Sequence, residues 1–191
     1  MTRTFLALEM NIALQSHLAE VIRQVARALP RLNWVNPTSI HLTLAFLGEL
    51  DDARLEQAMQ ATVAATQQVK PFSYHLTRVG IFGSPRQPRV VWMGIEEKSG
   101  SLSRLHRILN QELQQRDFAT EDRPFSPHFT LARVKHPLAP DEIQRLQDIL
   151  AGEQHGLVSP DEYPAHYVNV MKSELLRSGA HYTCLKAYPL A

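Results

Sequence analysis

The sequence Ser-Ile-His-Leu-Thr-Leu at residues 39–44 returns in the second half of the chain as Ser-Pro-His-Phe-Thr-Leu at residues 126–131. Each stretch is typical of a β-strand, in which residues two apart point to the same face, about 6–7 Å from each other. One face of each strand therefore carries an imidazole and a hydroxyl. The other face carries apolar side chains. The pair predicts two strands with a polar front and an apolar back, one in each half of the chain.

In the first strand, His41 and Thr43 form the polar front. Simple alternation places the other side chains on the apolar back, namely Ile40, Leu42, Leu44 and Phe46. In the second strand, His128 and Thr130 share the front, opposite Phe129 and Leu131. Because each half carries the same apolar-backed motif, the chain is also compatible with a diverged internal duplication.

Hydrophobic periodicity along the rest of the chain alternates between strand and helix spacing. Helical spacing covers residues 14–29, 51–63, 99–113 and 140–150, and strand-like runs cover residues 4–8, 39–47, 72–79, 89–96, 127–134, 167–176 and 181–187. Residues 80–88 and 152–164 are expected to be loops, and the last two strands should form a hairpin around Gly179. Short strands of alternating polarity between helices predict an α+β fold with antiparallel or mixed sheets.

Size and composition limit what the protein can be. A chain of 191 residues fits one domain or two small lobes sharing a core. The formal net charge of +1 argues against a protein that coats nucleic acid, so any RNA should bind through a local basic groove. The single cysteine, Cys184, cannot form an intramolecular disulfide and is expected in a buried or half-buried strand. No apolar run approaches the ~20 residues that span a bilayer, so we expect a soluble cytoplasmic protein.

The paired fronts suit phosphoryl chemistry. A cyclic phosphodiester requires an attacking water that loses a proton and a leaving ribose oxygen that gains one. Two imidazoles can do both if one is neutral and the other is charged. Threonine hydroxyls can donate to the non-bridging phosphate oxygens and stabilise the charge that develops there.

The bare His-x-Thr triplet is a weak signal. With nine histidines, about 0.5 triplets are expected by chance, and the sequence contains four. The other two are at residues 75–77 and 181–183, where a half-exposed strand position is the simpler interpretation. Only the triplets that begin at His41 and His128 continue as His-apolar-Thr-Leu, and these two are therefore the candidate catalytic motifs.

The flanks of these two motifs resemble the two signatures of the two-histidine (2H) phosphoesterases. The first signature covers Trp34 and residues 40–49, and the second covers residues 123–133. Both are similar to those of the bacterial and archaeal RNA 2′,3′-cyclic phosphodiesterases, also called 2′-5′ RNA ligases. Supporting matches extend the resemblance over nearly the whole chain, at residues 3–8, 88–92 and 171–175 and at Gly179, Tyr182, Pro189 and Leu190.

The resemblance implies one domain over residues 1–191, with two pseudo-symmetric lobes around a central cleft and helices outside. It implies hydrolysis of an RNA 2′,3′-cyclic phosphate to a 2′-phosphate without metal or cofactor, and 2′-5′ ligation as the reverse reaction. His41 matches the proton donor to the leaving 3′-oxygen, and His128 matches the base that activates water. Thr43 and Thr130 would hold the phosphate. The expected partner is an RNA end, and we expect a monomer that binds no membrane.

Other residues allow more than one interpretation. Arg133 follows the second motif and can add a cation for phosphate. Alternation places it on the back of the strand, unless a bulge or the strand end redirects it. Phe82, Arg86 and Arg89 can form a wall of an RNA groove or a plain surface loop. Trp34 and Trp92 are expected in the core rather than under a base, and no pair of histidines has the spacing of a helical metal site.

Three functions remain open at this point. The first is the RNA 2′,3′-cyclic phosphodiesterase. The second is a related phosphoesterase that acts on a small cyclic nucleotide or trims RNA ends, because the motifs contact only the phosphate. The third is a non-catalytic RNA-end binder, which the intact histidines and threonines of both motifs disfavour.

Overall fold

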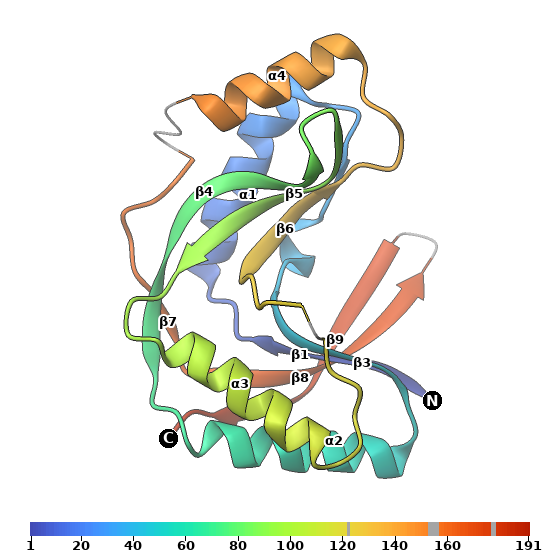
Figure 1. Cartoon of the computed structure of the whole chain (residues 1–191), viewed down its shortest axis with the longest axis vertical. Helices are drawn as coiled ribbons and strands as arrows, with labels where there is room; N and C mark the ends of the chain where they lie inside the picture. The colour runs from blue at the N-terminus through green and yellow to red at the C-terminus, as the bar shows by residue number, and fades with distance from the viewer. Residues whose placement is uncertain (122, 153–156, 177–178) are drawn as a thin grey trace.

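The computed structural model describes residues 1–121, 123–152, 157–176 and 179–191 (Figure 1). In these residues the chain forms strands, α-helices and one short 3-10 helix in the order β1 (Thr2–Leu8), α1 (Ile12–Ala28), β2 (Asn33–Trp34), η1 (Pro37–Ser39), β3 (Leu42–Leu50), α2 (Asp52–Thr66), β4 (Phe72–Ser84), β5 (Gln87–Glu96), α3 (Ser101–Gln114), β6 (His128–Arg133), α4 (Pro140–Ala151), β7 (Tyr163–Ala165), β8 (Tyr167–Leu176) and β9 (Gly179–Pro189).

Two sheets form the centre of the molecule. The four-stranded sheet has the order β3-β1-β8-β9, and the five-stranded sheet has the order β2-β6-β5-β4-β7. The pairings within both sheets of the described residues are antiparallel. The predicted α+β class is therefore confirmed. Each sheet contains one of the two motif strands, with β3 at an edge of the first sheet and β6 inside the second.

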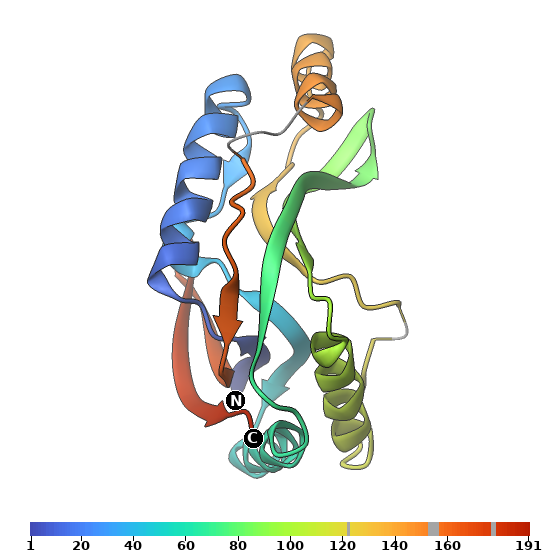
Figure 2. The ribbon, with the colours of Figure 1, turned by 90° about the vertical axis from the view of Figure 1, so that its left-hand side faces the viewer.

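The helices form two pairs at opposite ends of the molecule. Helices α2 and α3 pack together and against the four-stranded sheet, at the lower end of Figure 1. Helices α1 and α4 contact each other at the upper end, where α4 also packs on β4. The side view in Figure 2 shows α1 and α3 on opposite sides of β4. No helix among the described residues is long and apolar enough to cross a membrane.

The core lies behind the motif strands. Helix α1 buries one face, made by Leu14, Leu18, Val21, Ile22 and Val25. Its first turn is capped by Asn11, whose side-chain oxygen accepts a hydrogen bond from the Leu14 amide at 2.8 Å. The predicted apolar backs of the two motif strands are buried at Leu42, Phe129 and Leu131. Burial of each such side chain stabilises the fold by about 1.5–3 kcal/mol, which anchors both motifs to rigid strands.

Several element boundaries differ from the predictions. The predicted strand over residues 39–47 begins only at Leu42, because η1 occupies the preceding residues. The predicted loop over residues 80–88 is mostly strand, since β4 and β5 continue into a tight hairpin. The predicted loop over residues 152–164 contains β7 at its end and otherwise lies partly outside the described residues. The predicted turn at Gly179 includes residues 177 and 178, which also lie outside them.

The two tryptophans and the cysteine differ in how deeply the fold buries them. Trp34 packs against the core, as predicted, and its indole nitrogen donates to the Leu29 carbonyl at 3.0 Å. Trp92 is half-buried on the front of the five-stranded sheet rather than in the core. Cys184 lies in β9, as predicted, but its side chain is exposed, so the expectation of burial was wrong.

Candidate active site

Both motif histidines are held by the same backbone contact. The Nδ1 of His41 lies 3.0 Å from the Ser39 carbonyl oxygen, and the Nδ1 of His128 lies 2.7 Å from the Ser126 carbonyl oxygen. A carbonyl oxygen can only accept a hydrogen bond, so each Nδ1 must carry the proton. Each Nε2 is then the nitrogen that can take up or release a proton, which is the arrangement that acid–base catalysis requires.

A β-bulge follows each motif at the same position. In β3, Thr43 pairs with Ala7 and Ala45 pairs with Leu6, so Leu44 is an extra residue. In β6, Thr130 pairs with Trp92 and Ala132 pairs with Val91, so Leu131 is the extra residue. A bulge of one residue shifts the alternation of every side chain that follows it.

The two bulges change the face of one residue after each motif. Phe46 was predicted on the apolar back of β3, but it pairs with Phe5 and is 57% exposed on the front. That prediction was wrong because it assumed unbroken alternation. Arg133 pairs with Val90 and lines the same cavity as His128. The bulge at Leu131 therefore turns Arg133 to the front of β6, which strict alternation did not allow.

His41 is half-buried between two aromatic rings. Its imidazole lies 4.4 Å from the Phe5 ring, centroid to centroid, and meets the Tyr182 ring edge to face at 4.8 Å. Burial lowers the pKa of His41 below its ordinary value of 6.5, and the Arg133 guanidinium lowers it further. The hydrogen bond to the Ser39 carbonyl opposes this shift. His41 is therefore neutral at pH 7 in the unliganded site.

His128 has a more open setting. One aromatic ring, Phe82, meets its imidazole edge to face at 4.8 Å, and Phe82 in turn packs against Trp92 at 5.5 Å. The Trp92 ring lies over Gly80, where a Cβ atom would come within 2.3 Å of the indole. Gly80 thus leaves room for the Trp92 ring, against which Phe82 packs at a tilt, and Phe82 in turn meets His128 edge to face.

A cavity of about 870 Å³ opens between the two sheets and helix α3. Of the five predicted site residues, Thr43, His128 and Arg133 line it, whereas His41 and Thr130 do not. Thr130 lies on the front of β6, since it pairs with Trp92, two residues after His128. His41 lies close enough for the Arg133 charge to affect its pKa. The structure therefore brings three of the five predicted residues to one cavity, whereas His41 is linked to it through the charge of Arg133.

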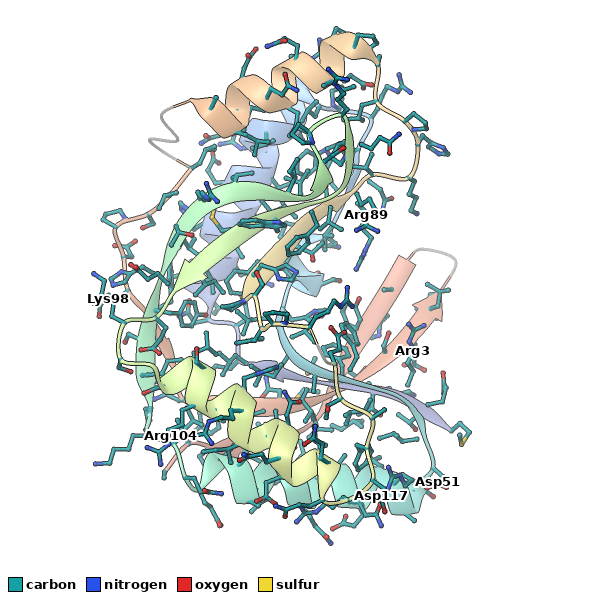
Figure 3. All side chains as sticks on the ribbon, viewed as in Figure 1. Arg3, Asp51, Arg89, Lys98, Arg104 and Asp117 are labelled. Atoms are coloured by element: carbon teal, nitrogen blue, oxygen red, sulfur yellow. The ribbon has the colours of Figure 1, made fainter. Side chains whose placement is uncertain are left out.

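The cavity is also lined by residues that the sequence did not single out as a site. These are mainly Leu44, Ala45, Phe46, His106, Asn110, Thr120, Glu121, Phe125 and Lys135. Phe125 lies within the second signature, but the sequence of that signature did not predict that its ring would contact helix α3. His106 and Asn110 lie on α3, where periodicity indicated only an amphipathic helix. Figure 3 shows Arg89, which also lines the cavity, beside β6 and far from α3.

The other His-x-Thr triplets lie outside this cavity. His75 is on β4, and its Nε2 lies 3.3 Å from the Glu162 carboxylate. His181 is on β9 and is exposed. Arg86 is exposed in the β4–β5 turn and does not line the cavity, whereas its neighbours Phe82 and Arg89 do. Within the described ranges, no three His, Cys, Asp or Glu side chains are grouped as metal ligands would be.

Comparisons with known proteins agree with this architecture. The RNA 2′,3′-cyclic phosphodiesterase of Methanothermobacter thermautotrophicus is 29% identical over 188 residues, which cover 98% of each chain. That of Thermotoga maritima is 31% identical over 144 residues, which cover 75% of each chain. The crystal structure of TT0787 of Thermus thermophilus matches with a TM-score of 0.81 at 26% identity, covering 98% of this chain and 97% of that chain. A family model of the 2′-5′ RNA ligase superfamily matches residues 13–162, and the chain belongs to this superfamily.

Proposed function

We propose that the protein hydrolyses RNA 2′,3′-cyclic phosphate ends to 2′-phosphates by metal-independent catalysis with two histidines. The observation that carries this proposal is the matched pair of imidazoles, each with its Nδ1 bound to the carbonyl two residues before it. Two relatives that match most of the chain are named RNA 2′,3′-cyclic phosphodiesterase, which supports the same reaction.

In this mechanism His128 is the base and His41 is the acid. The Nε2 of neutral His128 accepts a proton from the attacking water, and the Nε2 of charged His41 donates a proton to the leaving 3′-oxygen. The bond from water oxygen to phosphorus forms as the bond from phosphorus to the 3′-oxygen breaks, and the phosphate stays on the 2′-oxygen. The Thr43 and Thr130 hydroxyls donate to the non-bridging oxygens, and the Arg133 guanidinium balances their charge.

The lowered pKa of His41 affects this role in two ways. It makes the imidazolium a stronger acid toward the 3′-oxygen, but it leaves few unliganded molecules protonated at pH 7. An anionic phosphate bound beside Arg133 offsets the guanidinium charge and favours the imidazolium. We therefore expect His41 to take up its proton when the substrate binds.

The cations of the cavity suit an RNA chain rather than a lone phosphate. Arg89, Arg133 and Lys135 line the cavity, and none of them forms an ion pair with another described residue. Such free cations bind backbone phosphates and make binding salt-dependent. We infer that the substrate is an oligonucleotide end, bound by one monomer of this single domain.

The decisive experiment uses an RNA oligonucleotide with a 2′,3′-cyclic phosphate, incubated with the purified protein in excess chelator. The expected product carries its phosphate on the 2′-oxygen, and the rate does not change with chelator. A 3′-phosphate product would reverse the assignment of the leaving oxygen. Loss of all turnover in chelator would contradict the metal-independent mechanism.

The same assay separates RNA from a small nucleotide as the substrate. We expect kcat/KM for the oligonucleotide to exceed that for a 2′,3′-cyclic mononucleotide, and the difference to shrink as salt is raised. Equal values at low salt would favour the small nucleotide instead. Arg89→Gln should reduce the preference for the oligonucleotide, because it removes a cation far from the reacting phosphorus.

A further inference from the structure

The fold holds the backbones of the two motif histidines to different degrees. His128 is the first residue of β6 and pairs with Gly94 of β5. Strand β3 begins only at Leu42, so His41 lies in the link between η1 and β3. The hydrogen bond from the His41 Nδ1 to the Ser39 carbonyl, at 3.0 Å, stays within this local segment. The sheet therefore fixes His128 directly, whereas His41 needs further contacts to be held in place.

One hydrogen bond at Nδ1 does not fix the direction of Nε2. The torsion that turns an imidazole on its Cβ atom has broad minima, so the ring can rotate while Nδ1 keeps its acceptor. Nε2 lies on the far side of the ring from Cβ, and such a rotation changes the direction in which its proton points. Since a proton donor must face the oxygen that it protonates, a second contact on the ring is required.

That second contact is a cluster of three rings. The His41 imidazole lies 4.4 Å from the Phe5 ring and meets the Tyr182 ring edge to face at 4.8 Å. The Phe5 and Tyr182 rings also meet each other edge to face, with centroids 5.2 Å apart and planes at 83°. Aromatic pairs favour such edge-to-face geometries at centroid distances of about 4.5–7 Å. The imidazole is thus held on two sides by rings that support each other.

The two rings come from opposite ends of the chain. Phe5 lies in β1 and Tyr182 lies in β9, both outside the residues 13–162 that match the family model. Figure 1 shows these first and last strands, in blue and red, as parts of the four-stranded sheet. Neither residue lines the cavity, so each can act on a bound substrate only through His41.

We propose that Tyr182 is a positioning residue, whose ring holds the His41 imidazole with Nε2 toward the leaving oxygen and shields it from water. The inference rests on the proposed function, in which His41 is the proton donor. Phe5 contributes to the same cluster, but it is 1% exposed, so its replacement would also disturb the sheet. Tyr182 is half-buried on the edge strand β9 and can be replaced with less damage to the fold.

The kinetic test separates the ring of Tyr182 from its hydroxyl. Tyr182→Ala should lower the single-turnover kcat on a cyclic-ended RNA by about tenfold, because the proton donor is no longer aligned. KM should stay unchanged, since Tyr182 does not line the cavity. Tyr182→Phe keeps the ring and should restore most of the rate. Tyr182→Leu fills the space with apolar atoms but has no ring edge, so its kcat should also fall while more of the stability is kept.

A titration tests the same contact without any turnover. Burial, and then the Arg133 charge, lower the pKa of His41. Tyr182→Ala should therefore move this pKa up toward 6.5 in histidine NMR spectra of the free protein. The shift should be partial, because Arg133 on β6 and the Phe5 ring remain. Tyr182→Phe should leave the titration in place.

Tyr188 provides the matched control on the same strand. It is also half-buried in β9, but it packs against the core and lines a separate groove beside α2. Tyr188→Ala should lower the thermal stability and leave both kcat and the His41 titration unchanged. A loss of kcat in this variant as large as that in Tyr182→Ala would show that only general destabilisation had been measured.

The remaining outcomes separate the inference from the function beneath it. Full kcat in Tyr182→Ala would overturn the positioning role, and so would a Tyr182→Phe variant as slow as Tyr182→Ala. A higher KM with an unchanged kcat would show that Tyr182 binds the substrate instead. A wild-type protein without hydrolysis would contradict the proposed function. An unchanged His41 titration in Tyr182→Ala would contradict the shielding by the ring alone.

Discussion

The two motif strands are alike in backbone and unlike in surroundings. Both fix a histidine through a carbonyl two residues earlier, and both place a bulge at the leucine that follows the threonine. Around His41, however, burial between two aromatic rings and then a nearby guanidinium disfavour the charged form. Around His128, one ring touches the imidazole at its edge and the cavity is open.

This difference gives the two copies of the motif the unlike settings that the proposed acid and base require. The shared backbone contacts set the tautomer, which both an acid and a base require. The side chains from neighbouring strands then set access and charge, which differ between an acid and a base. The enclosed His41 suits transfer of a proton to an oxygen already bound to phosphorus. The open His128 suits a nucleophile that arrives from solution.

The largest effect should come from removing either imidazole. His41→Ala and His128→Ala should each lower kcat by about 10²–10⁴-fold, because each removes one proton transfer. His75→Ala is the matched control, since this histidine belongs to the same triplet but pairs with Glu162 on β4. Single-turnover assays on a cyclic-ended RNA measure the effect. Full activity in either motif variant would contradict the proposed mechanism.

The next largest effect should come from the threonines. Thr43→Val and Thr130→Val keep the strand shape but remove a donor to the phosphate, so kcat should fall by about 10²-fold. Thr77→Val, in the triplet on β4, serves as the control. Steady-state kinetics would also reveal an unequal contribution. A loss confined to one threonine would show that the two halves share the phosphate unequally.

A smaller effect is expected from removing the Arg133 charge, which acts on His41 in the first half of the chain. Arg133→Gln removes a charge that lowers the pKa of His41, so this pKa should move up toward 6.5. Histidine NMR titration of the free protein measures the shift directly. The limb of the kcat/KM profile that belongs to His41 should move to higher pH with it. Arg89 lines the same cavity but does not affect the His41 pKa, so Arg89→Gln should leave the titration in place.

The smallest effect should come from disturbing the ring contacts that link Gly80, through Trp92 and Phe82, to His128. Gly80→Ala places a Cβ within 2.3 Å of the Trp92 ring, which must shift and move Phe82 with it. We expect a loss of about 1–3 kcal/mol in the free energy of unfolding and a several-fold lower kcat. Thermal unfolding and turnover are the two measurements. Combining the change with Trp92→Leu should recover part of the stability, because the clashing ring is gone.

The sequence predicted most of the fold because its signals were local. The α1 periodicity at Leu14, Leu18 and Val21 marks a buried helix face directly. The apolar backs at Leu42 and Phe129 follow from the two-residue period of a strand. The pairing of the two motifs was visible because the histidine, the threonine and the leucine recur at fixed spacing.

What the sequence did not predict depends on partners far away in the chain. The bulges exist only relative to β1 and β5, so the face of Phe46 could not be read from β3 alone. The same is true of Arg133, for which a bulge was one of two interpretations. His106 stacks on Phe125, which follows it in the sequence only after the end of α3 and part of the next segment. The hydrophobic periodicity of a helix does not predict such a contact.

The paired bulges also explain how two copies of one motif can diverge. Because each bulge directs the third residue after the threonine into the cleft, one codon in each half controls what faces the substrate there. That residue is an aromatic ring in one half and a guanidinium in the other, Phe46 and Arg133. A substitution at either position changes the side chain that faces the cleft and leaves the backbone contacts of the two histidines in place. A single-residue insertion or deletion between the threonine and this residue would instead turn the side chain away from the cleft, so the spacing matters as much as the residue type.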